Sequence, residues 1–151
     1  MIKATYRHTN IIAEDWKTLS RFYQEVFGCT PVPPERDQSG QWLQDGTNVK
    51  NAALKGEHLL LPGFPKGGPT LEIYSYSEML IKHAPASNRK GFGHIAFEVD
   101  DVEKACKEIV KAGGKPYGKV VTREVPDAGT ITFTYVLDPE DNLIELQSWS
   151  K

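Results

Sequence analysis

Hydrophobic residues recur every three or four positions in two segments of the chain, and each segment predicts a helix with one buried face. Asp15 precedes the first segment as an N-cap residue and Gly28 ends it, whereas Asp101 precedes the second and Gly113-Gly114 ends it. The apolar positions of the first are Trp16, Leu19, Phe22, Tyr23, Val26 and Phe27. Those of the second are Val102, Ala105, Cys106, Ile109 and Val110.

β-branched and aromatic residues predict strands around both helices. The predicted strands are residues 6–12, 29–32, one or two strands within 48–61 interrupted near Gly56, 70–76, 93–99, 120–125, 131–138 and 143–149. The polar stretch 35–46 predicts a loop that carries Trp42, and the Gly/Pro-rich stretch 62–69 predicts a turn. A short helical turn is expected around residues 79–82, in the segment that joins the halves. Each half therefore has the order strand, helix, strand, strand, strand.

Composition and charge narrow the class of protein. With 151 residues, 39% hydrophobic and 25% charged, the chain is typical of a globular protein. A net charge of -2 gives no electrostatic basis for binding nucleic acid or an anionic membrane. The sequence has no run long and apolar enough to cross a bilayer, and its first residues lack the apolar core of a signal peptide, so we expect a cytoplasmic location. Cys29 and Cys106 are expected to be reduced thiols.

The two halves also repeat a set of polar residues. His8 and His94 are each followed by an Asp after seven residues and by a Gly after twenty. Later in each half a glutamate lies between two apolar residues, Glu72 in the first and Glu145 in the second. Because strand side chains alternate between faces, four such residues on four strands can point to one spot while their neighbours fill a core. His8, Glu72, His94 and Glu145 thus predict one metal site.

The chemistry of this residue set suits a divalent ion. Two carboxylates balance the charge of the ion, and two imidazoles with two carboxylates suit Fe, Mn, Co, Ni or Zn without choosing among them. Taken singly, a histidine on a strand or a glutamate between apolar residues is more often a solvated side chain. Four such residues at repeat-equivalent positions favour the interpretation as metal ligands. His58 and His83 have no repeat partner, and we interpret both as ordinary surface residues.

Strand alternation extends the candidate site. Five further side chains fall on the same face as the predicted ligands and are candidates for contact with a small organic oxyacid: Asn10, Tyr74, Tyr76, Gln147 and Trp149. Ordinary packing explains these residues about equally well. Glu72 or Glu145 is the candidate base, and the duplication does not distinguish between them.

The repeated modules, the Gly93-His94-Ile95-Ala96-Phe97 strand and the Asp-Pro-x-x-Asn-x-Ile-Glu-Leu ending at Leu146 resemble the vicinal oxygen chelate superfamily. That superfamily includes glyoxalase I, methylmalonyl-CoA epimerase, extradiol dioxygenases and bleomycin-binding proteins. The resemblance implies an α+β fold in which two tandem β-α-β-β-β modules form an open, cup-shaped mixed sheet. It also implies one domain over residues 1–151, with module 1 at 1–77, a linker at 78–91 and module 2 at 92–151. The four predicted ligands would lie at the floor of the cup.

Within the superfamily, the His/Glu/His/Glu set is most similar to glyoxalase I, the lactoylglutathione lyase. The resemblance predicts proton transfer next to a metal-bound oxyanion of a small substrate. A methylmalonyl-CoA-type epimerase, an Fe(II) extradiol dioxygenase and a non-catalytic binding protein are the alternatives. Ile12 and Tyr76 replace an Arg and an Asn that help hold glutathione in glyoxalase I, so the use of glutathione stays open. We expect a homodimer, with the ligands drawn from one chain or from two.

Overall fold

The computed structural model describes residues 1–150 and divides into two compact units, Met1–Ile81 and Lys82–Lys151. The elements of unit 1 are β1 (His8–Ile12), α1 (Trp16–Phe27), β2 (Thr30–Ser39), α2 (Gln41–Thr47), β3 (Ala53–Leu60) and β4 (Thr70–Tyr76). Those of unit 2 are β5 (Ile95–Glu98), α3 (Val102–Lys111), β6 (Lys115–Pro116), β7 (Val121–Val125), β8 (Gly129–Leu137) and β9 (Leu143–Ser150). Among residues 1–150, no helix combines the length and the apolar character that a bilayer span requires.

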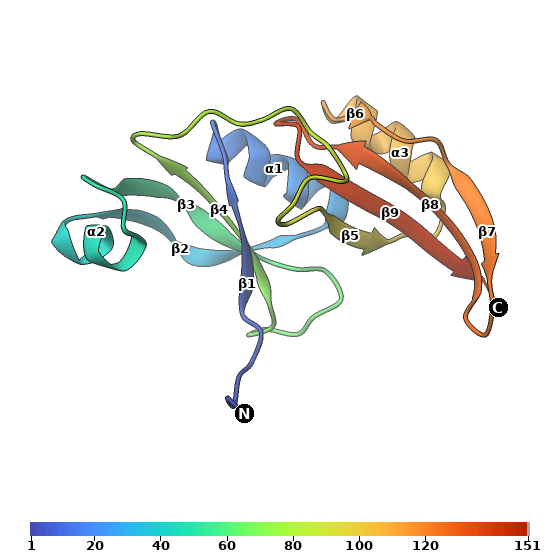
Figure 1. Cartoon of the computed structure of the whole chain (residues 1–151), viewed down its shortest axis with the longest axis horizontal. Helices are drawn as coiled ribbons and strands as arrows, with labels where there is room; N and C mark the ends of the chain where they lie inside the picture. The colour runs from blue at the N-terminus through green and yellow to red at the C-terminus, as the bar shows by residue number, and fades with distance from the viewer. Residues whose placement is uncertain (151) are drawn as a thin grey trace. The chain divides into compact units, whose positions relative to one another are not determined.

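The sheet of unit 1 has the strand order β1-β4-β3-β2, in which β1 runs parallel to β4 and the other neighbours are antiparallel. Helix α1 packs on one face of this sheet (Figure 1). Leu19 and Tyr23 of α1 are fully buried, as are Leu59, Leu71 and Ile73 of the strands. Because side chains alternate along a strand, Glu72 lies on the face that α1 leaves uncovered.

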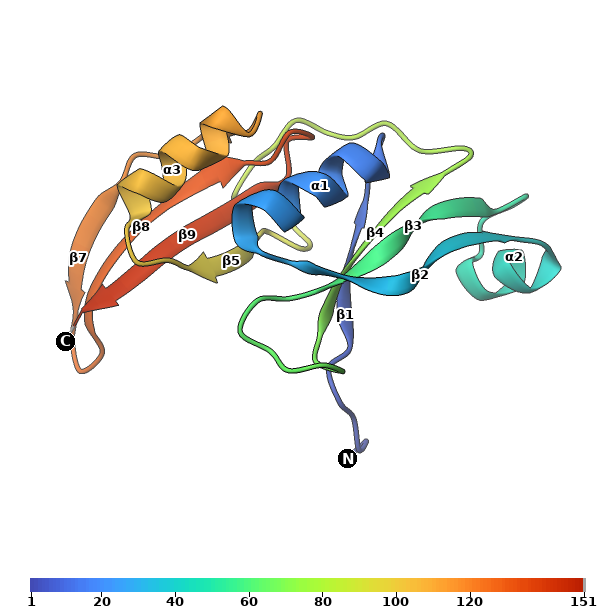
Figure 2. The ribbon, with the colours of Figure 1, turned by 180° about the vertical axis from the view of Figure 1, so that it is seen from behind.

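Unit 2 repeats this design with the strand order β5-β9-β8-β6 and with β7 paired to β8. Its parallel pair is β5 with β9, and α3 packs on one face of β8 and β9 (Figure 2). Ile109 of α3 and Ile144 and Leu146 of β9 are fully buried. Glu145 therefore also lies on the face opposite the helix. An α+β fold with two mixed sheets confirms the predicted fold class.

Three of the predicted helix boundaries are confirmed by their capping geometry. Asp15 accepts hydrogen bonds from the backbone nitrogens of Lys17 and Thr18. Gly28 takes the left-handed conformation at the end of α1, with φ 69°. Asp101 caps α3 by accepting from the backbone nitrogen of Lys104. Local sequence signals are sufficient here because a cap satisfies backbone groups of its own helix.

The loop predicted over residues 35–46 is wrong, since this stretch holds the second part of β2 and then α2. β2 pairs with β3 on both sides of a register shift between Val32 and Arg36. Pro33 and Pro34 lie within this shift, where the ladder needs no amide donor. Helix α2 is held by Leu43, which is buried against Ala52 and Tyr74. These tertiary contacts outweigh the polar composition of the stretch.

Smaller differences concern other elements. β3 is one continuous strand through Gly56, where a Cβ atom would lie 2.0 Å from the backbone oxygen of Ile73. Glycine at this position permits close strand pairing and does not interrupt the strand. Residues 79–82 form no helical turn. The short strand β6 was not predicted, and β5 begins at Ile95, one residue after His94.

Candidate metal centre

His8 and Glu72 come together in unit 1 because β1 and β4 are neighbours in its sheet. Nε2 of His8 lies 3.6 Å from Oε2 of Glu72. The glutamate side chain is only 14% exposed, whereas that of His8 is 45% exposed. One predicted pair thus lies at the surface with its carboxylate shielded from solvent and one imidazole accessible.

The structure adds His58, for which the interpretation as an ordinary surface residue is wrong. Its Nε2 atom lies 3.0 Å from Oε1 of Glu72 and 3.1 Å from the hydroxyl of Tyr74, and its Nδ1 atom lies 3.1 Å from Oγ1 of Thr70. The reason is the register of β3 against β4, in which His58 stands directly opposite Glu72. Following the predicted turn at 62–69 as a hairpin connection would have found this pairing. His83 lies on exposed chain outside any helix or strand, as expected.

The donor atoms of His8, His58 and Glu72 form a compact group. One ligand atom from each residue lies within 4.8 Å of those of the other two. Burial lowers the pKa of His58, helped by the charges of Arg36 and His8 and opposed by that of Glu72. Burial raises the pKa of Tyr74, and a hydrogen bond and the charge of Glu72 raise it further. A neutral imidazole and a neutral phenol therefore lie beside the carboxylate at neutral pH.

The second predicted pair, His94 and Glu145, comes together in unit 2. Nε2 of His94 lies 2.9 Å from Oε2 of Glu145, and the two side chains are 32% and 16% exposed. The ring of Tyr135 meets that of His94 edge-on, with 5.0 Å between centroids. Burial raises the pKa of Tyr135, as do the charge of Glu145 and a hydrogen bond with it. Sequence analysis missed Tyr135, although it stands directly opposite Glu145 in the pairing of β8 with β9.

The other predicted contact residues lie on the strands of these clusters. Asn10 donates from its side chain to the backbone oxygen of Glu72 over 3.3 Å. Tyr74 contacts the His58 cluster through its hydroxyl, and Tyr76 packs against the apolar cluster around Leu54. In unit 2, Trp149 donates through Nε1 to Oε1 of Gln147 over 3.0 Å. Their contact with a substrate stays a prediction.

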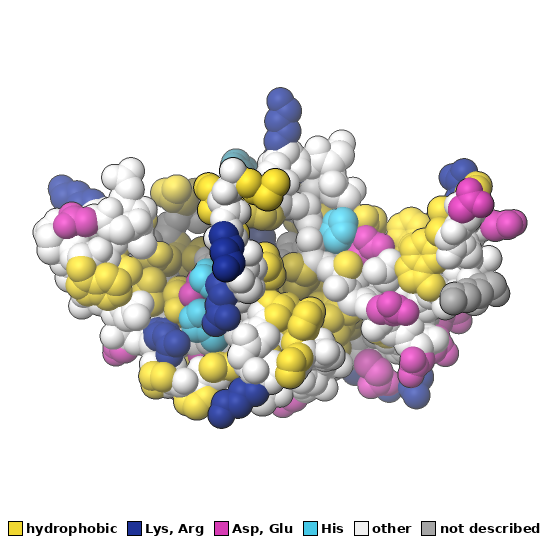
Figure 3. Space-filling model, turned by 90° about the horizontal axis from the view of Figure 1, so that it is seen from below, with side chains coloured by type: hydrophobic (Ala, Val, Ile, Leu, Met, Phe, Trp, Pro, Cys, Tyr) yellow, Lys and Arg dark blue, Asp and Glu magenta, His cyan; other side chains and the backbone are white. Residues whose placement is uncertain are grey.

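Figure 3 shows histidine side chains touching acidic side chains at two places on the surface, each bordered by hydrophobic side chains. Such pairs of an imidazole and a shielded carboxylate are competent metal donors, because each offers lone pairs without a strong competing ion pair to Lys or Arg. The Lys and Arg salt bridges found among residues 1–150 join Lys55 to Asp37, Lys111 to Glu108 and Lys115 to Asp141. Glu72 and Glu145 pair with histidine in the structure.

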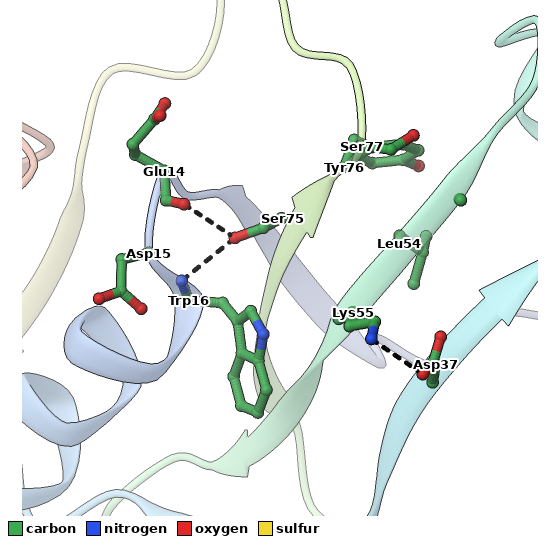
Figure 4. A pocket seen from close by; sticks show the side chains of 10 residues that line it. Glu14, Asp15, Trp16, Asp37, Leu54, Lys55, Ser75, Tyr76 and Ser77 are labelled. Atoms are coloured by element: carbon green, nitrogen blue, oxygen red, sulfur yellow. Dashed lines mark hydrogen bonds and ion pairs between the residues drawn. The ribbon is translucent and has the colours of Figure 1, made fainter.

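A separate pocket of about 300 Å³ lies in unit 1 where α1 begins and β4 ends. Its lining includes Glu14, Trp16 and Ser75 (Figure 4). Ser75 accepts from the backbone nitrogen of Trp16 over 3.1 Å and donates to the backbone oxygen of Ala13 over 2.7 Å. These bonds fasten the start of α1 to β4. The pocket contains none of the histidine and glutamate donors of the two clusters.

Comparison with known proteins places the sequence in one family. The model of the Glyoxalase/Bleomycin resistance protein/Dioxygenase superfamily matches residues 5–146. The chain therefore belongs to this superfamily, which is the vicinal oxygen chelate group indicated by its sequence motifs.

A lactoylglutathione lyase of Schizosaccharomyces pombe is 28% identical over 160 residues, covering 98% of this chain and 49% of the relative. The chain spans about half the length, or less, of the curated relatives it matches.

Solved structures support the fold. A glyoxalase family protein from Bacillus cereus matches with a TM-score of 0.75 at 17% identity, covering 100% of this chain and 96% of the other. The fosfomycin resistance protein FosX from Listeria monocytogenes, solved with Mn(II) and sulfate, matches with a TM-score of 0.55 at 16% identity, covering 99% and 95%. At these identities the likeness establishes the fold alone.

Proposed function

We propose that this protein is a metal-dependent enzyme similar to glyoxalase I, which moves a proton next to an oxyanion of a small substrate. The observation that carries this proposal is the pair of histidine–glutamate contacts, His8 with Glu72 and His94 with Glu145, in two duplicated units. His8 begins β1, and His94 directly precedes β5. We propose that these four residues bind one divalent ion, within one chain or between the chains of a dimer.

The donors fit such an ion. Both carboxylates are largely shielded from solvent, and each already has an imidazole nitrogen within 3.6 Å. Two anionic and two neutral donors would give a neutral site with a divalent cation and suit Ni, Zn, Mn, Fe or Co. Mn(II) in the FosX structure supports a divalent ion in this fold without choosing its identity here.

An ion held by His8, Glu72, His94 and Glu145 would act as a Lewis acid and stabilise negative charge that develops on a substrate oxygen. The protein must then supply the base. Glu145 or Glu72 would take the proton from the carbon beside the substrate carbonyl and return it to the neighbouring atom. Tyr135 beside Glu145, and Tyr74 and His58 beside Glu72, would keep each carboxylate in place through hydrogen bonds.

The substrate is a small or medium organic oxyacid or thioester in this proposal. Ile12, which replaces an arginine of glyoxalase I, is 44% exposed. Arg36 stands opposite Gly56 in the register of β2 with β3 and therefore lies on the same face as His58 and Glu72. Its guanidinium supplies a positive charge that would attract a substrate carboxylate. Sequence analysis missed Arg36 because residues 35–46 were predicted as a loop.

The deciding experiment measures turnover after the protein is loaded with Ni, Mn, Fe or Zn. We expect isomerisation of a hemithioacetal, or exchange of the α-proton of an acyl thioester, that depends on metal. Glu145→Gln should lower kcat by about 100-fold or more, because it removes both a proposed metal ligand and a candidate base. Glu103→Gln is the matched control: Glu103 is exposed on α3, which packs on the face of the sheet opposite Glu145, and this variant should keep full activity.

The alternatives give different results in the same experiment. Exchange at a thioester without hemithioacetal turnover would indicate an epimerase. Oxygen consumption with a catechol after loading with Fe(II) would indicate an extradiol dioxygenase. Binding of small molecules with no turnover and no dependence on metal would contradict the enzyme proposal and indicate a binding protein.

We also propose a cytoplasmic location and a homodimer. The two cysteines, Cys29 and Cys106, are both free thiols, which suits a reducing compartment. The large apolar side chains of Leu80, Ile81 and Phe92 are almost fully exposed and support self-association.

A further inference from the structure

Unit 1 contributes His8 and Glu72 to the four proposed ligands, and it contains a third possible metal donor, His58. We propose that unit 1 binds a divalent first-row transition metal through His8, His58 and Glu72, without donors from His94 and Glu145. The proposal shares His8 and Glu72 with the proposed function, but it assigns a new ligand and does not depend on unit 2.

Two of the distances within this group are close to those around a bound ion. When bonds from metal to ligand are about 2.1 Å, neighbouring ligand atoms lie about 3.0 Å apart in octahedral and about 3.4 Å apart in tetrahedral geometry. His58 Nε2 lies 3.0 Å from Oε1 of Glu72, and His8 Nε2 lies 3.6 Å from Oε2. All three donors fall within 4.8 Å of one another. Small side-chain rotations would therefore bring all of them to one ion.

His58 is also held in the manner of a metal ligand. In metal sites, a ligating histidine donates its second ring nitrogen to an oxygen that fixes the ring. Nδ1 of His58 lies 3.1 Å from Oγ1 of Thr70, a partner across the sheet, which leaves Nε2 directed toward Glu72 and Tyr74. The side chain of His58 is only 17% exposed, so the strand pairing already determines its position.

The chemistry of the set selects a class of ion. Two imidazoles and one carboxylate form the facial donor set that leaves open positions on Fe(II), and the same donors accept Co(II), Ni(II) and Zn(II). Carboxylate-rich sites suit Ca²⁺ and Mg²⁺ better, because these ions require mostly oxygen ligands. Unit 1 should therefore bind transition metals and exclude Ca²⁺ and Mg²⁺.

The competing explanation is that His58 only holds Glu72 by a hydrogen bond. The test uses the full-length His94→Asn/Glu145→Gln variant, which removes the donors of unit 2. Cu(II) and Co(II) binding is measured by calorimetry, and the imidazoles on bound Cu(II) are counted by pulsed electron paramagnetic resonance. We expect about one ion per chain with two imidazoles. Adding His58→Asn should weaken binding by roughly 100-fold or more and leave one imidazole.

A matched control removes a histidine outside the group. His83→Asn in the same background should leave affinity and imidazole count unchanged, because His83 lies on exposed chain away from any strand. Circular dichroism verifies the fold of each variant, and His58→Gln replaces His58→Asn if the latter unfolds. If His58→Asn binds as tightly as its parent, the proposal is wrong and His58 only positions Glu72. If the double variant binds no ion while the wild type does, this proposal fails and the four-residue site survives. Loss of binding in the wild type as well would overturn both.

Discussion

Burial raises the pKa of the Cys29 thiol and should lower its reactivity. Cys29 is 4% exposed, and burial raises its pKa to about 11 from an ordinary value of 9.0. At pH 8 a thiol with this pKa has about 100-fold less thiolate than an ordinary one. Alkylation of Cys29 by iodoacetamide in a Cys106→Ser variant, followed by mass spectrometry, should therefore be about 100-fold slower than that of a model thiol.

The change of the alkylation rate with pH tests the direction of the pKa shift of Cys29. Because the pKa is raised, the rate should increase about tenfold per pH unit from pH 8 to about 11, where an ordinary thiol levels off near 9. A rate within tenfold of the model thiol at pH 8 would mean that Cys29 is accessible and ordinary.

Individual residues differ in how far sequence alone predicts their roles. His8, His94, Glu72 and Glu145 could be selected because the duplication repeats them, and the structure brings each histidine to the glutamate of its own unit. His58 has no counterpart in the second half, so repetition could not reveal it. Its role follows from strand register, which depends on contacts between residues distant in sequence.

Among the strands, Gly56 of β3 is the position where adding a single methyl group should most reduce stability. An added Cβ would lie 2.0 Å from the backbone oxygen of Ile73 and 2.4 Å from the ring of Tyr74. Gly56→Ala should therefore lower the free energy of unfolding by about 1–3 kcal/mol, measured by urea denaturation.

Gly46 is the matched control within α2, where a Cβ meets nothing within 4 Å. Gly46→Ala should raise the free energy of unfolding by about 0.5–1 kcal/mol, because alanine favours a helix. A Gly56→Ala variant as stable as the wild type would contradict the close pairing of β3 with β4.

Elements with their own stop and start signals were predictable, and those held by distant contacts were not. Asp15, Gly28 and Asp101 define α1 and α3 from sequence, since caps act within a few residues. Helix α2 has no side-chain hydrogen bond at its N-cap and depends on Leu43, which packs against residues of β3 and β4. That contact exists only after the sheet has formed.

For the whole molecule, we predict that the chain forms a homodimer. Leu80, Ile81 and Phe92 are 98%, 94% and 104% exposed, which is unusual for large apolar side chains. We expect a homodimer in sedimentation equilibrium. Leu80→Ser should raise the Kd of the dimer by about tenfold or more, since burying a leucine is worth about 1.5–3 kcal/mol. A wild type that sediments as a monomer at all concentrations would contradict this prediction.

The central claim is a divalent metal site built from the duplicated histidines and glutamates. Its most direct test is elemental analysis of purified protein after loading with Ni, Mn, Fe or Zn and dialysis. The wild type and Glu103→Gln should each hold about one ion per chain, and the Glu72→Gln/Glu145→Gln variant should hold none, because its remaining neutral donors bind divalent ions weakly. A wild type that retains no metal after any loading would contradict the claim.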